Sequence, residues 1–380
     1  MSDISTNGTK LPHINDDLIW KIFVKVEPKT VGRLKVVNKA WKYRLSTPLF
    51  IKQNWEKNKH RDKSVIIGIG YPPADQNSQW FVRVMADTGA QIQFSIPFNI
   101  NGFWFYSLIG SDHGVLCVRV SPGGLNARLI IWNPLTRKTN FVTDEAIRHC
   151  SHAVSLYAFG FTHDSMEYRI LHVYKKHIEK RRMSWALYNS IDADWVDSGT
   201  FESNVQKLGP KSIVNDEKAY WVGWDGVGYL NPVSICTFNL QQQQCYEGNI
   251  PDETKSTYHT LTHFKEGVGF ISYHNIGFMK QMVVWGLKED NNNMLVWDKF
   301  FKVSEIAIPH NPTLFVGKDI LSIMELRCSS GGSNDTERTD ILLTRLKFMS
   351  STRDILLHQT WQERVYVKTI TMYSEELYMV

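Results

Sequence analysis

The segment Gly110 to Gly114 places three residue types of a nucleophilic triad side by side: Ser111, Asp112 and His113. A working triad needs its serine, histidine and acid joined by hydrogen bonds in one line, beside an oxyanion hole. Contiguous loop residues point in different directions, and no strand-to-helix nucleophile elbow surrounds this serine. The segment is therefore interpreted as a turn, and a hydrolase built on it is kept only as a third hypothesis for function.

A second group with possible chemistry consists of His149, Cys150 and His152, all zinc-ligand residue types. Structural zinc sites use paired ligand clusters, and no fourth ligand stands at metal-site spacing, so an ordinary loop is expected here. Glycine pairs that could cradle a phosphate follow or lie within strand-like runs and lack the Lys-Ser/Thr pair of a phosphate loop: Gly68/Gly70, Gly226/Gly228 and Gly267/Gly269. The sequence thus predicts no metal and no cofactor.

The composition is that of a folded chain, because 43% of its 380 residues are hydrophobic and 21% are charged. Residues 1–10 are polar and are expected to form a disordered tail rather than a signal peptide. No apolar run is long enough to span a bilayer, so we expect no membrane contact and a cytoplasmic and/or nuclear location. In that reducing setting the cysteines are interpreted as core residues: Cys117, Cys150, Cys236, Cys245 and Cys328.

Positive charge is concentrated near the N-terminus. The stretch Leu11 to His60 holds eleven Lys and Arg against four acids, a balance of +7, whereas the whole chain carries +5. This uneven distribution predicts an acidic partner for the N-terminal part and a different kind of partner for the rest.

The stretch from Asn15 to Lys57 predicts four short helices. Asn15 can cap the first, Pro28 opens the second, Asn38 starts the third, and Thr47 with Pro48 opens the fourth. Apolar residues recur at helical spacing in the first helix: Leu18, Ile19, Ile22, Phe23 and Val26. These helices are too short and too apolar on several sides to bury themselves, so they need a partner surface. The alternative is a small helical cap packed on the following domain.

After the basic run Lys57 to Lys63, the hydrophobic periodicity changes to two, which is typical of strands. Strand-like runs are predicted from Val65 to Ile69, Trp80 to Met85, Gln91 to Ile96, Val115 to Val120, Leu129 to Trp132, Thr139 to Val142, Ala158 to Phe161, Tyr168 to Tyr174, Trp185 to Asn189, Ala219 to Trp224, Ser234 to Asn239, Gly267 to Tyr273, Met282 to Gly286, Asp319 to Leu326 and Asp340 to Leu346. They group into units that close near Ile96, Val142, Val196, Ile250, Val303 and Leu357.

A spacing of this kind, with about four short strands in each unit, predicts a β-propeller of about six blades that begins at Ser64. A two-sheet β-sandwich with extra hairpins is the alternative. Most tryptophans are expected in the core between blades. Trp224, in the glycine-rich turn Gly223 to Gly228, is expected at the surface and is the candidate target contact.

The basic run Lys175 to Arg182 lies between two strand-like runs. This position favours a solvated hairpin tip over a nuclear signal or an RNA-contacting patch, and nucleic acid is not the expected partner.

Two stretches of the chain carry a family resemblance. The first consists of Leu11-Pro12, Asp17, Leu18, Ile22 and Phe23, Pro28 to Thr30, Arg33 to Val37, Lys39 to Trp41 and Ser46 to Phe50. The second consists of Gly110 to Cys117, Trp132 to Arg137, Tyr157 to Asp164 with Tyr168, Val214-Asn215, Ser234 to Leu240, and Val283 to Trp285 with Trp297. In this order they resemble plant F-box proteins with an F-box-associated domain.

The resemblance implies a fold that is α+β overall, with a helical F-box at residues 11–60 and an all-β F-box-associated domain at residues 61–380 that binds the target. The F-box of such proteins docks on a small acidic Skp-type adaptor and through it on a cullin. Carried over by position, the docking residues are Leu11, Pro12, Leu18, Ile22, Pro28, Leu34, Val37 and Trp41. Gly32 departs from the pattern, standing where a bulkier apolar residue is common, and predicts weaker docking.

The leading hypothesis is therefore a non-catalytic substrate-recognition subunit of a Skp-cullin-F-box ubiquitin ligase, which holds an unknown target protein for ubiquitination and proteasomal degradation. The alternative is a propeller that binds protein, glycan or RNA without a ligase.

Overall fold

The structure, a computed structural model, contains two compact units, Met1–Arg61 with Glu375–Tyr378 and Asp62–Ser374 with Met379–Val380. It describes residues 15–58, 64–70, 81–85, 91–95, 105–121, 128–144, 154–175, 181–209, 211–225, 232–251, 258–264, 267–276, 279–289, 295–304, 313–316, 320–329, 338–348, 355–364 and 371–373. The predicted tail at residues 1–10 lies outside this set.

The first unit contains the four predicted helices, α1 (Asp16–Val24), α2 (Pro28–Val37), α3 (Lys39–Arg44) and α4 (Pro48–Asn58). Asn15 Oδ1 accepts the Asp17 N–H at 3.0 Å, and Asn38 Oδ1 accepts the Ala40 N–H at 2.7 Å. The Thr47 hydroxyl accepts the Phe50 N–H at 3.3 Å. Each of these side chains satisfies a backbone donor at the start of a helix, so the predicted starts are confirmed.

The helices enclose a small apolar core of Val24, Val31, Leu45, Phe50 and Ile51, all buried. Two edge-to-face ring pairs surround it, Trp20 with Phe50 and Phe23 with Trp41, each with centroids 5.1 Å apart. These pairs join α1 to α4 and α1 to α3.

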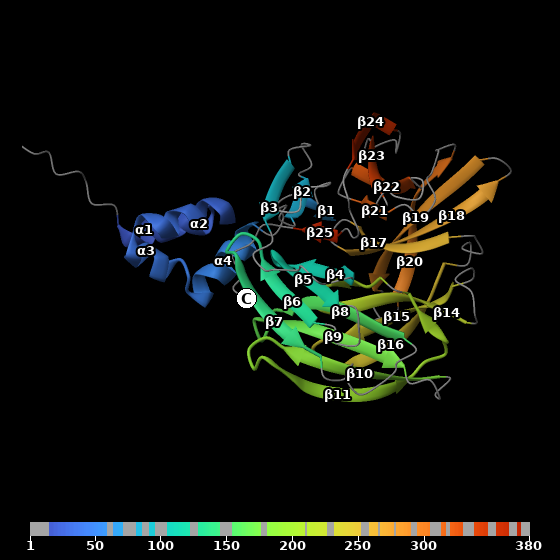
Figure 1. The fold of residues 1–380 in the computed structure, drawn as a ribbon, viewed down its shortest axis with the longest axis horizontal. Coiled ribbons are helices and arrows are strands. Elements are labelled where there is room, and N and C mark those ends of the chain that lie inside the picture. Colours follow the sequence, from blue (N-terminus) through green and yellow to red (C-terminus); the bar gives the residue numbers. More distant parts are fainter. Residues whose placement is uncertain are drawn as a thin grey trace, which may run out of the picture. The chain divides into compact units, whose positions relative to one another are not determined.

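The second unit is built from four-stranded antiparallel blades (Figure 1). Blade 1 contains β1 (Ser64–Gly70), β2 (Phe81–Met85) and β3 (Gln91–Ser95), with β25 (Thr371–Tyr373) beside β1. Blade 2 contains β4 (Phe105–Asp112), β5 (Val115–Ser121), β6 (Arg128–Asn133) and β7 (Lys138–Thr143). Blade 3 contains β8 (Val154–Thr162), β9 (Glu167–Lys175), β10 (Arg182–Asn189) and β11 (Asp194–Glu202). Blade 4 has a divided first strand, β12 (Lys207–Leu208) and β13 (Ile213–Asn215), then β14 (Lys218–Trp224), β15 (Pro232–Asn239) and β16 (Gln244–Asn249).

The remaining eight-stranded sheet is two further blades. Blade 5 contains β17 (Tyr258–Phe264), β18 (Gly267–Ile276), β19 (Met279–Glu289) and β20 (Leu295–Ser304), and blade 6 contains β21 (Thr313–Val316), β22 (Ile320–Ser329), β23 (Arg338–Phe348) and β24 (Ile355–Arg364). A single parallel pair, Phe264 with Val316, joins β17 to β21. The inner strands β25, β4, β8, β13, β17 and β21 adjoin one another in that order.

The described strands therefore form a propeller of six blades, which confirms the predicted fold and excludes the sandwich. Pairing of β1 with β25 closes blade 1 with a strand from the far end of the chain. The sequence reading missed this closing strand, because three residues are too few to show a periodicity of two.

Facing blades pack through large apolar side chains. Between blades 3 and 4, Trp185 packs edge-to-face on Phe238 at 5.2 Å, and Trp221 is buried in the same cluster. This confirms that these tryptophans belong to the core.

One turn design recurs at the outer hairpins of blades 2, 3 and 4. In each, an asparagine ends the third strand, and its Oδ1 accepts backbone N–H groups two and three residues ahead: Asn133, Asn189 and Asn239. The fourth residue after each asparagine has positive φ, at Arg137 (59°), Ala193 (55°) and Gln243 (57°). The asparagine turn after Trp132 is thus one member of a repeat.

Blades 3 and 4 approach closely at Gly160 on β8. A Cβ atom at this position would lie 2.5 Å from Val214 Cγ1 and 2.9 Å from Leu240 Cδ1, both on blade 4. Contacts this short force side chains or backbone to move.

We therefore predict that Gly160→Ala lowers the free energy of unfolding by about 1–3 kcal/mol, as measured by urea denaturation. Gly110→Ala is the matched control, because its Cβ would meet Phe159 atoms at 3.6 and 3.7 Å, which are ordinary contacts. Equal stability of the two variants would contradict the close approach of blades 3 and 4.

Candidate functional site

The docking residues predicted on α1 lie on its outer face. Leu18 is 54% exposed and Ile22 is 56% exposed, and their spacing of four residues places them one turn apart on the same side. Val37, at the end of α2, is 72% exposed, and Leu34 is partly buried. The structure thus leaves apolar side chains of two helices in water.

The other predicted docking residues are placed differently. Pro28 is buried within the protein, and Trp41 is partly buried against Phe23. These two residues can support the shape of the surface, but Pro28 does not offer a free contact. Leu11 and Pro12 lie outside the described residues.

Three further apolar side chains on this unit are exposed and were not predicted as docking residues: Val36 at 87%, Tyr43 at 78% and Leu49 at 61%. Val36 and Val37 are adjacent and about 100° apart around the helix axis, so both can lie on the outer face of α2. These three residues fall outside the helical spacing of the buried core positions, and a search for apolar residues outside that spacing could have found them.

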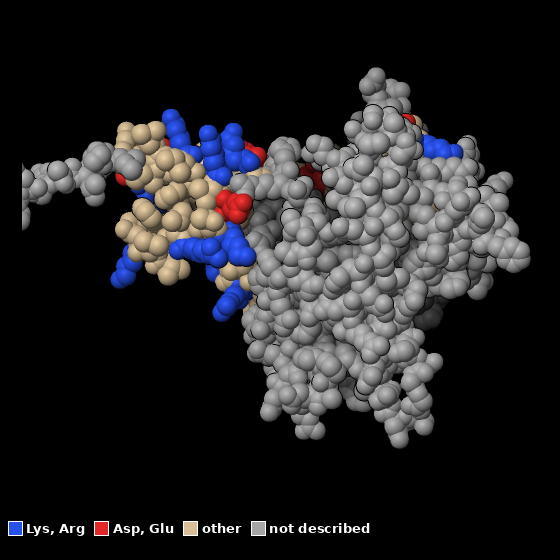
Figure 2. All heavy atoms as spheres, turned by 90° about the horizontal axis from the view of Figure 1, so that it is seen from above, with Lys and Arg blue, Asp and Glu red and all other residues tan. Residues whose placement is uncertain are grey.

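Basic side chains surround this apolar surface. Residues 15–58 hold ten Lys and Arg against four Asp and Glu, a balance of +6. Figure 2 shows Lys and Arg side chains along opposite edges of the helical unit, with uncharged surface between them. Arg44 pairs with Asp16 at 2.9 Å, but both side chains are more than half exposed, so this ion pair adds little stability. The unit therefore presents an apolar surface with a basic rim.

The position of α1 is fixed by two asparagines of α4. The Asn54 amide donates to the carbonyls of Val24 at 3.0 Å and Val26 at 2.8 Å, and Asn58 donates to the Asn54 carbonyl at 2.7 Å. Asn54 is 1% exposed. It satisfies carbonyls at the end of α1 that have no partner within that helix. Because the donor comes from thirty residues away in the sequence, local sequence reasoning missed it.

We predict that Asn54→Leu, which keeps the side-chain volume, destabilises the helical unit by about 1–3 kcal/mol. The reason is that the Val24 and Val26 carbonyls lose their shorter hydrogen bonds and keep only the 3.4 Å contacts from Asn58. Urea denaturation followed by circular dichroism at 222 nm measures this loss. Lys52→Leu is the control, since Lys52 is exposed on the same helix. If Asn54→Leu were as stable as wild type, the hydrogen bonds of Asn54 would not be what holds α1 in place.

Of the three residues Ser111, Asp112 and His113, the last two serve the contact between blades 2 and 3. β4 continues to Asp112, and the turn follows at His113 and Gly114, both with positive φ. Asp112 contacts His113 Nδ1 through Oδ1 at 2.7 Å and accepts the Phe161 N–H of blade 3 through Oδ2 at 2.8 Å. The turn prediction therefore holds for His113 and Gly114, while Ser111 and Asp112 belong to the strand.

A different serine, histidine and aspartate meet between the same blades. His172 on β9 contacts Ser155 Oγ on β8 through Nε2 at 2.8 Å. Its Nδ1 lies 2.8 Å from Asp144 Oδ2, although off the direction of the ring N–H. The Tyr157 hydroxyl donates to the same oxygen at 2.9 Å, and its ring stacks on His172.

This arrangement resembles a triad in its atom types, but His172 is 0% exposed and Asp144 is 2% exposed. Asp144 follows β7 of blade 2, whereas its partners lie on blade 3. The cluster therefore joins blades 2 and 3 through buried polar contacts. Burial and the nearby Asp144 carboxylate raise the pKa of Tyr157, so its hydroxyl keeps the proton that it donates.

Trp224 is not at the surface. It is 5% exposed and belongs to the core cluster with Ile235 and Trp285. The prediction of exposure is wrong, because Trp224 packs against side chains of blade 5 such as Phe270 and Trp285. The reason for choosing Trp224 as a target contact therefore no longer holds.

The remaining sequence candidates supply no further chemistry within the described residues. Cys117 and Cys236 are buried free thiols, and burial raises the pKa of Cys245 to about 12. No group of three His, Cys, Asp or Glu side chains in the described part of the chain could hold a metal. His149, Cys150 and His152 lie outside that part. Among the described helices, none is long and apolar enough to cross a membrane.

Four short helices followed by a six-bladed propeller define the class of protein, and comparison with known proteins gives the family. The model of the F-box associated beta propeller domain matches residues 90–326, more than half of the chain. The chain therefore belongs to this family, and the resemblance to plant F-box proteins is confirmed.

Two relatives are predicted F-box proteins of Arabidopsis thaliana. At3g17490 is 24% identical over 199 residues, 49% of this chain and 47% of the relative. At3g25460 is 25% identical over 230 residues, 57% of this chain and 58% of the relative. The matches thus span about half the length of these relatives.

Solved structures show weaker likeness. YjhT matches with a TM-score of 0.38 and 11% identity over 73% of this chain and 99% of its own. A variant of Aleuria aurantia lectin in complex with α-methyl-L-fucoside matches with a TM-score of 0.37 and 11% identity over 80% and 97%. At such scores the fold rests on the strand pairing described above, and the ligands of these proteins carry no argument here.

Proposed function

We propose that the chain is the substrate-recognition subunit of a Skp-cullin-F-box ubiquitin ligase. In this proposal the helical unit binds a Skp-type adaptor, which links the chain to a cullin, and the propeller binds a target protein. The observation that carries the proposal is the pair of half-exposed apolar side chains, Leu18 and Ile22, on a helix whose other side packs through Trp20, Phe23 and Val24. The F-box relatives support the same reading.

The physical chemistry of the surface favours a small acidic adaptor. Burial of an aliphatic side chain against a partner contributes about 1.5–3 kcal/mol when complete. The basic rim attracts an acidic protein and raises its association rate, especially at low salt. The apolar contacts would thus supply most of the affinity, and the charges would select the partner.

The chain's contribution to ubiquitination would be positional. Holding the target beside the ligase raises its effective concentration at the ubiquitin-transfer centre. The ubiquitin-transfer chemistry would lie on other subunits, and the target would then be degraded by the proteasome. Such a role places the chain in the cytoplasm and/or nucleus.

We predict that Ile22→Glu weakens binding of a purified plant Skp adaptor by about 30-fold, corresponding to about 2 kcal/mol at an interface anchor. Isothermal titration calorimetry on the full chain measures the change. Because Ile22 is more than half exposed, the fold should be retained, and a thermal denaturation curve checks this.

Ile191→Glu is the matched control, because Ile191 is an apolar residue of the propeller that is 65% exposed. Its adaptor affinity should equal that of wild type. Equal affinities for all three proteins, or no adaptor binding by wild type, would refute the proposed docking.

A further inference from the structure

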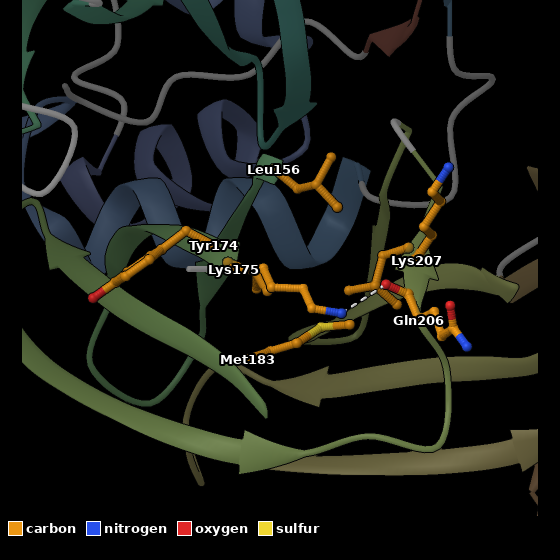
Figure 3. Close-up of a pocket in the computed structure, with 8 residues that line it drawn as sticks. Leu156, Tyr174, Lys175, Met183, Gln206 and Lys207 are labelled. Carbon is orange, nitrogen blue, oxygen red and sulfur yellow. Dashed lines mark hydrogen bonds between the residues drawn. The ribbon is translucent and has the colours of Figure 1, made fainter. Parts of the chain in front are cut away.

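The space between blades 3 and 4 is crossed by one lysine. Figure 3 shows Lys175 extending across it with Leu156 and Met183 on two sides, and its Nζ donates to the Gln206 carbonyl at 3.0 Å. Leu156 and Met183 are buried core residues, and what remains between the blades holds no more than a water molecule. The exposed surface of the helical unit therefore offers a partner more than this space does.

Helix α2 contains a glycine that the fold does not require. Gly32 lies in the middle of Pro28–Val37 and has a helical backbone rather than the positive φ of Gly114. Apart from its own helix backbone and its two chain neighbours, no described atom lies within 4 Å of the place where a Cβ would stand. Turn geometry and close packing inside the chain, two usual reasons for a glycine, therefore do not account for Gly32.

The sequence of α2 gives the helix little stability of its own. Glycine disfavours a helix interior more than any residue except proline, and valine is a weak helix former. Beside Gly32 the helix contains Val36 and Val37, which are 87% and 72% exposed. The N-cap residue, Glu27, makes no side-chain hydrogen bond to the start of the helix. These residues therefore suit a contact with another protein better than they suit an isolated helix.

Gly32 has one apolar and two basic neighbours on its side of α2. Residues three and four apart lie next to one another on a helix surface. Val36 is thus one turn beyond Gly32, while Lys29 and Lys35 lie three residues before and after it. Side chains on a helix lean toward its N-terminus, so Val36 leans toward the turn that contains Gly32. We call Gly32, Lys29, Lys35 and Val36 together the Gly32 site.

We infer that the Gly32 site receives a bulky apolar side chain of the acidic Skp-type adaptor, with a neighbouring carboxylate of the adaptor beside Lys29 and Lys35. A residue without a side chain lets such a group approach the helix backbone. The inference rests on the proposed function, because it names Gly32 as a residue that determines specificity in that contact. Adaptors with a large side chain at this point would be favoured.

Charge decides between the adaptor and a second copy of this chain as the occupant. Residues 15–58 carry a balance of +6, so two helical units would repel one another, whereas an acidic adaptor would be attracted. A bulkier residue at position 32, as is common in the F-box pattern, would fill the Gly32 site from within the chain.

Binding of a purified plant Skp adaptor to variants of the full chain, measured by isothermal titration calorimetry, tests the inference. Gly32→Ala should weaken binding about fivefold and Gly32→Leu about 30-fold, because the added carbons occupy space that the adaptor side chain would take. Both variants should also raise, by about 4 °C, the temperature at which the circular dichroism signal at 222 nm is lost, because alanine and leucine favour a helix over glycine.

Val36→Ala should weaken adaptor binding about tenfold, because it removes apolar area beside Gly32. Val196→Ala is the matched control, since Val196 is a partly exposed valine of the propeller, and it should leave adaptor binding unchanged.

Lower affinity together with higher stability is a result that a purely structural role of Gly32 cannot give. Adaptor binding by Gly32→Leu that equals or exceeds that of wild type would overturn the inference and leave the proposed function standing. No adaptor binding by wild type would refute both. If light scattering showed wild type alone to be a dimer and Gly32→Leu a monomer, a second copy would occupy the Gly32 site, and the inference would likewise fail.

Discussion

Contacts on the inner face of α1 fix the rotation of this short helix and leave Leu18 and Ile22 on its outer face. The helices of the N-terminal unit contain only six to eleven residues, so each has one inner face and cannot bury the other. Trp20 donates to Gln53 at 2.8 Å, and Asn54 holds the end of α1, so the inner face of that helix is committed to the core. Leu18 and Ile22 cannot turn inward without breaking these contacts. A second protein is therefore the proposed means of removing them from water.

Neighbouring blades of the propeller are held together by different kinds of contact in the interior and at the outer rim. Apolar clusters fill the space between blades, and the buried Asp144–His172 contact joins blades 2 and 3. At the outer rim, Trp195 donates to the Thr143 carbonyl and Trp297 to the Asn249 carbonyl, each linking an outer strand to the preceding blade.

Features set by local chemistry could be predicted from the sequence. The helix starts follow from Asn15, Asn38 and Thr47, whose side chains act within three residues, and the strand runs follow from the alternation of apolar residues. The asparagine turns at positions 133, 189 and 239 recur 56 and 50 residues apart and could have located three blades. Contacts between distant residues left no local signal: the Asn54 hydrogen bonds to the end of α1, the closing strand β25, the burial of Trp224, and the Lys175–Gln206 contact between blades 3 and 4.

Hydrogen-deuterium exchange of the full chain, with and without a saturating amount of purified plant Skp adaptor, tests whether a second protein covers the outer face of α1. We predict slower exchange in peptides that cover α1 and α2, and unchanged exchange in β8 to β11. Unchanged exchange in both helices, or protection confined to the propeller, would contradict the claim that the outer face of α1 is covered by a second protein.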